Sequence, residues 1–270
     1  MISFPNAKIN LGLRVCERRS DGYHELETVF VPIPLCDILE IVDASQTEFE
    51  FSGLPIPGAL DSNLLVKVWE RFQTDFKLPA QKILLHKKIP MGAGLGGGSA
   101  DAAFFIKLLN QKFELNLSTI ELQQFARKFG ADCAFFIENK TVLARGIGDL
   151  FSNVELPTQQ YYILLVKPPV HVSTAQAYGN VIPAKPSKSI STILKQPIST
   201  WKAELINDFE TGVFKIYPEL AAIKQKLYDM GAIYAAMSGS GSTLFGLYVD
   251  KPDFSDFEND NFVFCEKIKF

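Results

Sequence analysis

Long apolar runs, paired cysteines and dense clusters of one charge are all missing from this 270-residue sequence. No apolar stretch reaches the roughly 20 residues that cross a bilayer, and Met1 to Leu13 carries Lys8 where a signal peptide would be apolar. The four cysteines form no C-x-x-C pair, which argues against disulfides and a zinc site and favours a cytoplasmic protein. With 27 basic and 30 acidic residues and no basic run, we expect neither nucleic acid nor a membrane as a partner.

The sequence has enough apolar residues, 47%, to fill one large core or two ordinary ones. Strand-like and helix-like stretches alternate along it without repeats, which predicts a mixed α/β architecture. We expect strands over residues 7–15, 28–32, 38–42, 82–86, 161–166 and 262–268, and a hairpin over 233–249. We expect helices over residues 64–76, 99–109, 118–129, 188–194, 202–209 and 218–230. The pattern breaks over residues 153–160, so we predict two domains, 1–153 and 154–270.

The first predicted strand has charged and polar residues on one side only. Ala7, Ile9 and Leu11 alternate with Lys8 and Asn10, and successive side chains of a strand point to opposite faces. Lys8 and Asn10 are therefore predicted to point the same way.

Five glycines occupy the seven positions from Gly92 to Gly98, immediately before an apolar helical segment. Glycines leave backbone N–H groups free to converge on an anion, and the start of a helix at Ser99 would add the positive end of its dipole. Lys87 and Lys88 lie just upstream and would add positive charge. The stretch therefore predicts a phosphate site, with a tightly packed glycine turn as the plainer alternative.

Two familiar phosphate motifs fit this stretch poorly. Gly92 to Gly97 matches G-x-G-x-x-G, but a dinucleotide fold needs a second parallel strand and an acidic residue about 20 positions later. That region instead contains Ser118 and Glu121, spaced as a helix capping box. The other phosphate loop, G-x-x-x-x-G-K-[ST], requires lysine where Gly98 stands.

Three segments together resemble one kinase family. Lys87–Ala103 resembles the central phosphate-binding motif of the small-molecule kinases named after galactokinase, homoserine kinase, mevalonate kinase and phosphomevalonate kinase. Pro5–Leu13 resembles the family's first motif and Met237–Gly246 its third. The resemblance implies an α+β fold, with an N-terminal domain like ribosomal protein S5 domain 2 and a ferredoxin-like C-terminal domain.

The resemblance also implies an ATP-dependent reaction and its residues. Asp132 matches the family's proposed catalytic base, and Lys8 the lysine that stabilises developing negative charge. ATP would enter with Mg²⁺ held by its phosphates, and Ser99 is a possible further ligand of the ion. The residues implied to bind ATP are Asn63, Lys87, Pro90, Met91, Gly92, Ala93, Gly94, Leu95, Gly96, Gly97, Gly98, Ser99 and Ala100. Relatives often carry serine where Ala100 stands, and Asp101 could act through water or only favour the helix start.

Within the family, Arg19–Leu26 is similar to members whose acceptor is a polyol linked to cytidine diphosphate. Tyr23 and His24 would then recognise the base, Tyr178 would add a second aromatic ring, and Asn10 would orient the acceptor. Capping, core packing or an ordinary turn would explain the same residues without a ligand. Two other functions stay open: a kinase of mevalonate, phosphomevalonate or homoserine, and a nucleotide-binding protein without activity.

Overall fold

The computed structural model describes all 270 residues, and they form two compact units that alternate along the sequence. The first unit comprises Met1–Ala7, Leu35–Met91 and Gly96–Lys140, and the second comprises Lys8–Pro34, Gly92–Leu95 and Thr141–Phe270. The predicted domain boundary after Asn153 lies within the second unit, so it remains a prediction from the sequence.

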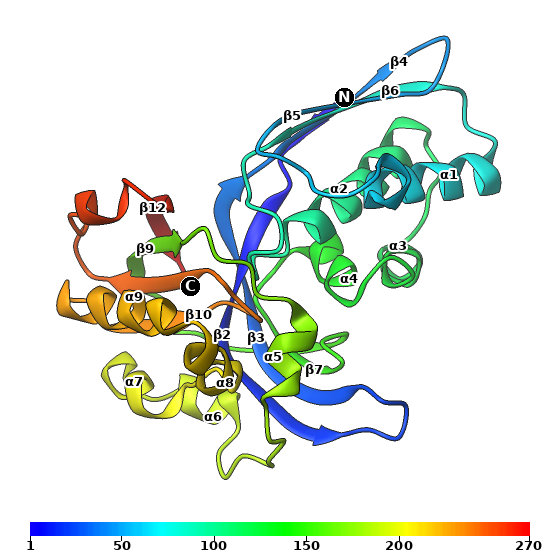
Figure 1. Ribbon diagram of the computed structural model, residues 1–270. Coiled ribbons are helices and arrows are strands. Elements are labelled where there is room, and N and C mark those ends of the chain that lie inside the picture. Colours follow the sequence, from blue (N-terminus) through cyan, green and yellow to red (C-terminus); the bar gives the residue numbers. More distant parts are fainter. The chain divides into compact units, whose positions relative to one another are not determined.

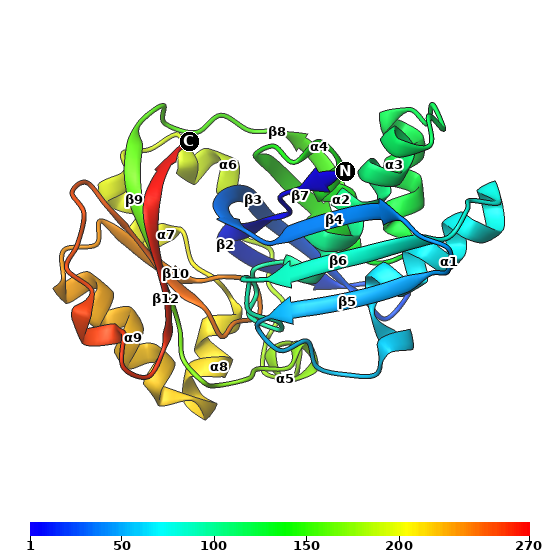
Figure 2. The same cartoon turned by 90° about the horizontal axis from the view of Figure 1, so that it is seen from above.

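The first unit contains a four-stranded sheet in the order β1 (Ile2–Ser3), β4 (Ile38–Asp43), β6 (Gln81–Lys87) and β5 (Glu48–Gly53). Strand β6 pairs antiparallel with β4 and parallel with β5, and these three strands lie side by side in Figure 2. Alternate residues such as Leu39, Ile41, Ile83 and Leu85 are buried, which is the period of two expected of a sheet with one covered face.

Four α-helices complete this unit: α1 (Leu64–Phe76), α2 (Gly97–Lys112), α3 (Thr119–Arg127) and α4 (Ala131–Glu138), with the short 3₁₀ helix η1 (Leu60–Ser62) before α1. They gather together in Figure 1. The side chain of Asn63 caps α1 by accepting the N–H of Leu65 at 2.9 Å. The predicted capping box of Ser118 and Glu121 is confirmed at the start of α3.

One expectation for this unit is wrong, and one helix was not predicted. Helix α2 begins at Gly97 rather than Ser99, because Gly96 is its N-cap and Ala100 already donates its N–H to the carbonyl of Gly96. Ser99 is therefore a residue of the first turn and not the cap. Helix α4 was not predicted, and it places Asp132 in its own first turn.

The second unit contains two sheets. One has the order β2 (Asn6–Arg18, of which Asn6 and Ala7 belong to the first unit), β3 (His24–Cys36), β7 (Val142–Gly146) and β8 (Leu150–Asn153). The other is antiparallel, in the order β10 (Tyr234–Met237), β11 (Leu244–Tyr248), β9 (Gln160–Lys167) and β12 (Phe262–Lys269). The pairing of β10 with β11 confirms the predicted hairpin.

The helices of the second unit are α5 (Thr174–Gly179), α6 (Ile190–Leu194), α7 (Trp201–Glu204), α8 (Phe209–Ile216) and α9 (Pro218–Asp229), with 3₁₀ helices η2 (Ile198–Thr200) and η3 (Ser255–Phe257). Helix α9 matches its prediction within one residue. A single helix over 202–209 is wrong, because the chain between α7 and α8 pairs with β2 instead. Leu13 donates its N–H to Ile206 and accepts the N–H of Asp208.

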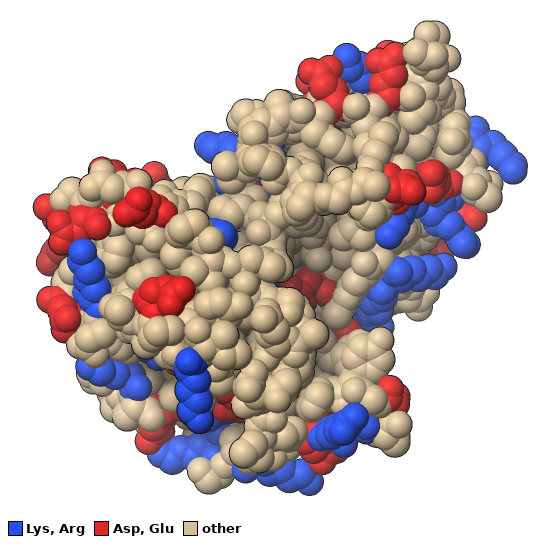
Figure 3. Space-filling model, in the orientation of Figure 1, with Lys and Arg blue, Asp and Glu red and all other residues tan.

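None of the helices is both long and apolar enough to cross a bilayer. Basic and acidic side chains are interspersed over the face drawn in Figure 3, as the nearly balanced composition leads one to expect.

Candidate active site

The glycine-rich loop adopts a backbone that requires glycine at alternate positions. Gly92, Gly94 and Gly96 have φ values of 61°, 76° and 71°, in the left-handed region that side chains disfavour. Close packing adds a second constraint at Gly94, where a Cβ atom would lie 2.0 Å from the carbonyl oxygen of Ser238. At Gly97 a Cβ atom would lie 2.8 Å from the Cγ2 atom of Ile89.

Gly98 is different, because neither its backbone nor its packing calls for glycine. It lies in the first turn of α2, has no positive φ, and a Cβ atom would meet only the Cε atom of Met91, at 3.5 Å. Glycine inside a helix costs about 0.5–1 kcal/mol relative to alanine. Some other demand, such as close approach of a ligand to the backbone, is the natural explanation.

The three sequence motifs meet at the first half of this loop. The N–H of Lys8 donates to the carbonyl of Leu95 at 2.9 Å, and the hydroxyl of Ser238 donates to the carbonyl of Gly94 at 2.9 Å. The same hydroxyl accepts the N–H of Asn10 at 3.3 Å. Residues about 85 and 145 positions away in the sequence therefore hold the loop.

Lys8 and Asn10 lie on the same face of β2, as predicted, and both are almost completely buried. The ammonium of Lys8 donates to Asn10 Oδ1 at 2.7 Å and lies 4.9 Å from the centre of the Phe30 ring. Asn10 in turn donates to the hydroxyl of Thr28 at 2.9 Å. Asn10 is thus engaged in orienting Lys8.

In the first unit, Asp132 is half-buried in the first turn of α4, where a negative charge interacts favourably with the helix dipole. The hydroxyl of Ser99, in the first turn of α2, is hydrogen-bonded to the thiol of Cys133, the residue that follows Asp132. Burial raises the pKa of that thiol to about 11, so it stays protonated. The starts of α2 and α4, with Ser99 and Asp132, are therefore neighbours.

Lys87 has a different environment from the one expected. Its ammonium is fully buried and forms ion pairs with Asp37 and, at 2.7 Å, with Asp101. Its charge is matched by two carboxylates and is not free to attract phosphate. Asp101, a residue of uncertain role in the sequence, is one of these partners.

Most other residues expected at the ATP site are buried within the protein. Pro90, Ala93, Leu95 and Ala100 are buried. Because Ala100 has no exposed surface, a serine at this position would have a buried hydroxyl. Met91 is half-buried beside Gly98.

The aromatic residues expected at the base converge within the second unit. The rings of His24 and Tyr178 are stacked with their centres 4.8 Å apart, and Tyr178 also contacts Phe209 edge-on. Tyr23 lies in the turn between β2 and β3 and is 62% exposed. The sequence placed His24 and Tyr178 154 residues apart with no sign that they touch.

Comparison with known proteins assigns the family. The models for the N-terminal and C-terminal domains of GHMP kinases match residues 63–140 and 195–260. The chain is 54% identical over 252 residues to 4-diphosphocytidyl-2-C-methyl-D-erythritol kinase of Bacteroides fragilis, covering 92% of each chain. It is 48% identical to that of Bacteroides thetaiotaomicron, covering 99% of each. The chain belongs to the 4-diphosphocytidyl-2-C-methyl-D-erythritol kinases. It is therefore an ATP-dependent small-molecule kinase.

Solved structures agree with this family. A crystal structure of 4-(cytidine 5'-diphospho)-2C-methyl-D-erythritol kinase is 30% identical, covers all of both chains and has a TM-score of 0.86. A crystal structure of mevalonate kinase has a TM-score of 0.73 at 13% identity, which shows a shared fold. The predicted two-domain α+β kinase fold is confirmed.

Two functional residues of this kinase, Asn207 and Glu210, were not predicted from the sequence. The amide of Asn207 donates to the carbonyls of Met237 and Gly239, both at 2.8 Å, and Glu210 accepts the N–H of Met237 at 2.8 Å. Both side chains are buried and hold the third motif. The available signal was a polar residue on each side of the apolar Phe209. The predicted helix over 202–209 included Asn207 and ended one residue before Glu210.

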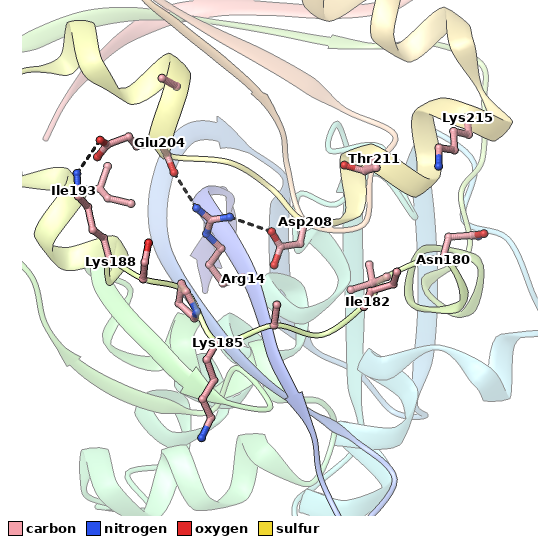
Figure 4. A pocket seen from close by; sticks show the side chains of 15 residues that line it. Arg14, Asn180, Ile182, Lys185, Lys188, Ile193, Glu204, Asp208, Thr211 and Lys215 are labelled. Atoms are coloured by element: carbon pink, nitrogen blue, oxygen red, sulfur yellow. Dashed lines mark hydrogen bonds and ion pairs between the residues drawn. The ribbon is translucent and has the colours of Figure 1, made fainter.

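A separate cavity of about 680 Å³ lies in the second unit of this kinase (Figure 4). Its wall includes Arg14, which donates to Asp208 at 3.1 Å and to the carbonyl of Glu204 at 2.9 Å. Lys188 pairs with the carboxylate of Glu204 at 2.7 Å. None of the predicted site residues lines this cavity.

Proposed function

We propose that this kinase transfers the γ-phosphoryl group of ATP to the 2-hydroxyl of 4-diphosphocytidyl-2-C-methyl-D-erythritol. The step would belong to the non-mevalonate route to isoprenoid precursors, in the cytoplasm. The relatives from Bacteroides fragilis and Bacteroides thetaiotaomicron support this acceptor, since they are named for it. The competing acceptors, homoserine and mevalonate, appear in the names of solved structures that are 18% and 13% identical, and a likeness at that level shows the fold alone.

One observation carries the proposal: the first and third motifs hold the glycine loop through hydrogen bonds to Leu95 and Gly94. A kinase needs positioning and charge stabilisation more than covalent chemistry. The buried residues Lys8 and Ser238 fix the loop and so supply that positioning. Lys8 is attached to the same network through Asn10.

The phosphates of ATP are proposed to lie against the first turn of α2. The N–H groups there have no partner within the helix and the dipole favours an anion. Gly98 has no side chain, so a phosphate can approach its backbone N–H closely. No packing contact or positive φ otherwise explains glycine at this position. The hydroxyl of Ser99 is an oxygen ligand of the kind that suits Mg²⁺, which would enter with ATP and neutralise phosphate charge.

The chemical step is assigned to Asp132 and Lys8. Asp132 accepts the proton of the acceptor hydroxyl while the hydroxyl oxygen forms a bond to the γ-phosphorus. The bond from that phosphorus to the oxygen bridging it to the β-phosphate breaks, and ADP leaves with the electron pair. Lys8 stabilises the negative charge that develops on the oxygens.

His24, Tyr178 and the exposed Tyr23 are proposed to bind the cytosine ring. His24→Ala and Tyr178→Ala should each raise KM for the cytidine-containing acceptor about 5- to 100-fold, because stacking on a base contributes about 1–3 kcal/mol. KM for ATP should stay within about threefold. His86→Ala is the matched control, since His86 is exposed on β6 and bonded only to Ser52. A rise in KM for ATP with no change for the acceptor would mean that the two subsites are exchanged.

The acceptor itself is tested by ADP release with a panel of CDP-methylerythritol, mevalonate and homoserine. We expect turnover with CDP-methylerythritol alone, and phosphorus NMR of the product should place the new phosphate on the 2-oxygen. Turnover with mevalonate or homoserine only would overturn the assignment. ATP binding without turnover of any of the three would favour a nucleotide-binding protein.

A further inference from the structure

We propose that Lys87 is a positioning residue, which fixes the first turn of α2 against β6 through Asp37 and Asp101 so that the amides of Gly97 and Gly98 face the nucleotide. This inference rests on the proposed ATP site. It replaces the expectation that Lys87 attracts phosphate directly.

The three side chains join separate parts of the first unit. Lys87 is the last residue of β6, Asp37 lies between β3 and β4, and Asp101 is the fifth residue of α2. All three are buried, with no exposed surface on the side chains of Lys87 and Asp37. Their ion pairs therefore connect the end of strand β6 to the start of helix α2, and replacing one of the three side chains should alter that connection.

Asp37 also fixes the backbone that leads into the glycine loop. Its Oδ1 atom accepts the N–H of Lys88 at 2.6 Å and that of Ile89 at 2.8 Å, while its Oδ2 atom accepts from Lys87. The same carboxylate thus holds both the strand end and the first residues of the segment that continues to Gly92. Charge-assisted hydrogen bonds of this kind are roughly twice as strong as neutral ones.

The ammonium lies directly against the helix start. A Cβ atom on Gly97 would come 3.0 Å from Lys87 Nζ, so the bare Cα of Gly97 is what lets α2 approach the lysine. Gly53 packs against the backbone of Lys87 in the same way, since a Cβ atom on Gly53 would lie 2.2 Å from the carbonyl oxygen of Lys87. Close contacts with Gly53 and Gly97 therefore restrict both the backbone and the ammonium of Lys87.

Two variants at Asp101 separate positioning from charge. Asp101→Asn removes the charge and retains an oxygen that can accept from Lys87, whereas Asp101→Leu removes the charge and the hydrogen bond together. Lys87 keeps Asp37 as a partner in both. Titration with a non-hydrolysable ATP analogue at pH 8 should give a Kd about tenfold or more higher for the leucine variant than for the asparagine variant, because small displacements of a positioned group can cost up to about 100-fold. The Kd of the acceptor should be the same in both.

The outcomes are distinct. Equal Kd values for Asp101→Asn and Asp101→Leu, with both folded, would overturn the positioning role. Tighter binding by Asp101→Leu than by Asp101→Asn would mean that a freed Lys87 contacts phosphate. Failure of the parent kinase to bind the analogue would overturn the proposed ATP site itself. The comparison of the two variants measures binding alone and does not depend on catalytic activity.

Discussion

Replacing Asp132 with asparagine should lower kcat by about 10²- to 10⁴-fold, the usual scale of a general-base contribution, with KM for both substrates changed far less. The asparagine keeps the shape of the side chain in the first turn of α4 but cannot accept a proton. Lys8→Met should also lower kcat, because it removes positive charge where the transition state gains negative charge. The double variant should be little worse than the poorer single variant, since residues that act as one unit are not additive.

Glu121→Gln is the matched control for Asp132→Asn. Glu121 is likewise an acid in the first turn of a helix, α3, and glutamine can fill the same place in a capping box. Its kcat should equal that of the parent kinase. Near-parental turnover by folded Asp132→Asn would remove the aspartate as base and leave a mechanism based on Lys8 and the loop amides.

Alanine at Gly94 and alanine at Gly98 should have opposite effects on stability. Gly94→Ala should lower the free energy of unfolding by about 2 kcal/mol or more, because it places a side chain at positive φ and against the carbonyl of Ser238. Gly98→Ala should raise stability by up to about 1 kcal/mol, since it replaces glycine within a helix at a site with room for a Cβ atom. Thermal and urea unfolding measure both.

Gly98→Ala should nevertheless weaken ATP binding, if the phosphates approach the backbone there as proposed. Isothermal titration of the two variants with an ATP analogue tests this at temperatures where both are folded. Unchanged affinity in Gly98→Ala would move the phosphate away from this turn. Full stability of Gly94→Ala would show that the loop can rearrange around Ser238 at little cost.

Local patterns were sufficient for much of the fold. The alternation along β2 predicted that Lys8 and Asn10 share a face, and the hydrogen bond between them confirms it. Ser118 and Glu121 predicted the start of α3 because a capping box is a contact between near neighbours in the sequence. The three motifs, read together, predicted the kinase family that the comparisons show.

The errors lie where a distant partner competes with a local preference. Residues 202–209 have a helical pattern, yet Leu13 of β2 takes up the backbone groups of Ile206 and Asp208 and interrupts the helix. Helix α2 begins at Gly97 because Gly96 adopts the positive φ of its N-cap position. The prediction placed the start at Ser99 because serine is a common N-cap residue.

The sequence by itself determined which chemistry is available: a glycine-rich loop, a buried lysine on a strand, an acid at Asp132 and a set of aromatic rings. Only the tertiary structure decided which charges are free and which are matched. Lys87 and Lys88 are adjacent in the sequence, but the side chains of successive residues in extended backbone point opposite ways. Lys87, the last residue of β6, is therefore buried between Asp37 and Asp101, while Lys88 is exposed. Asp37 is 50 residues from Lys87, and a partner that far away leaves no local pattern because it is chosen by packing and by the need to match every buried charge.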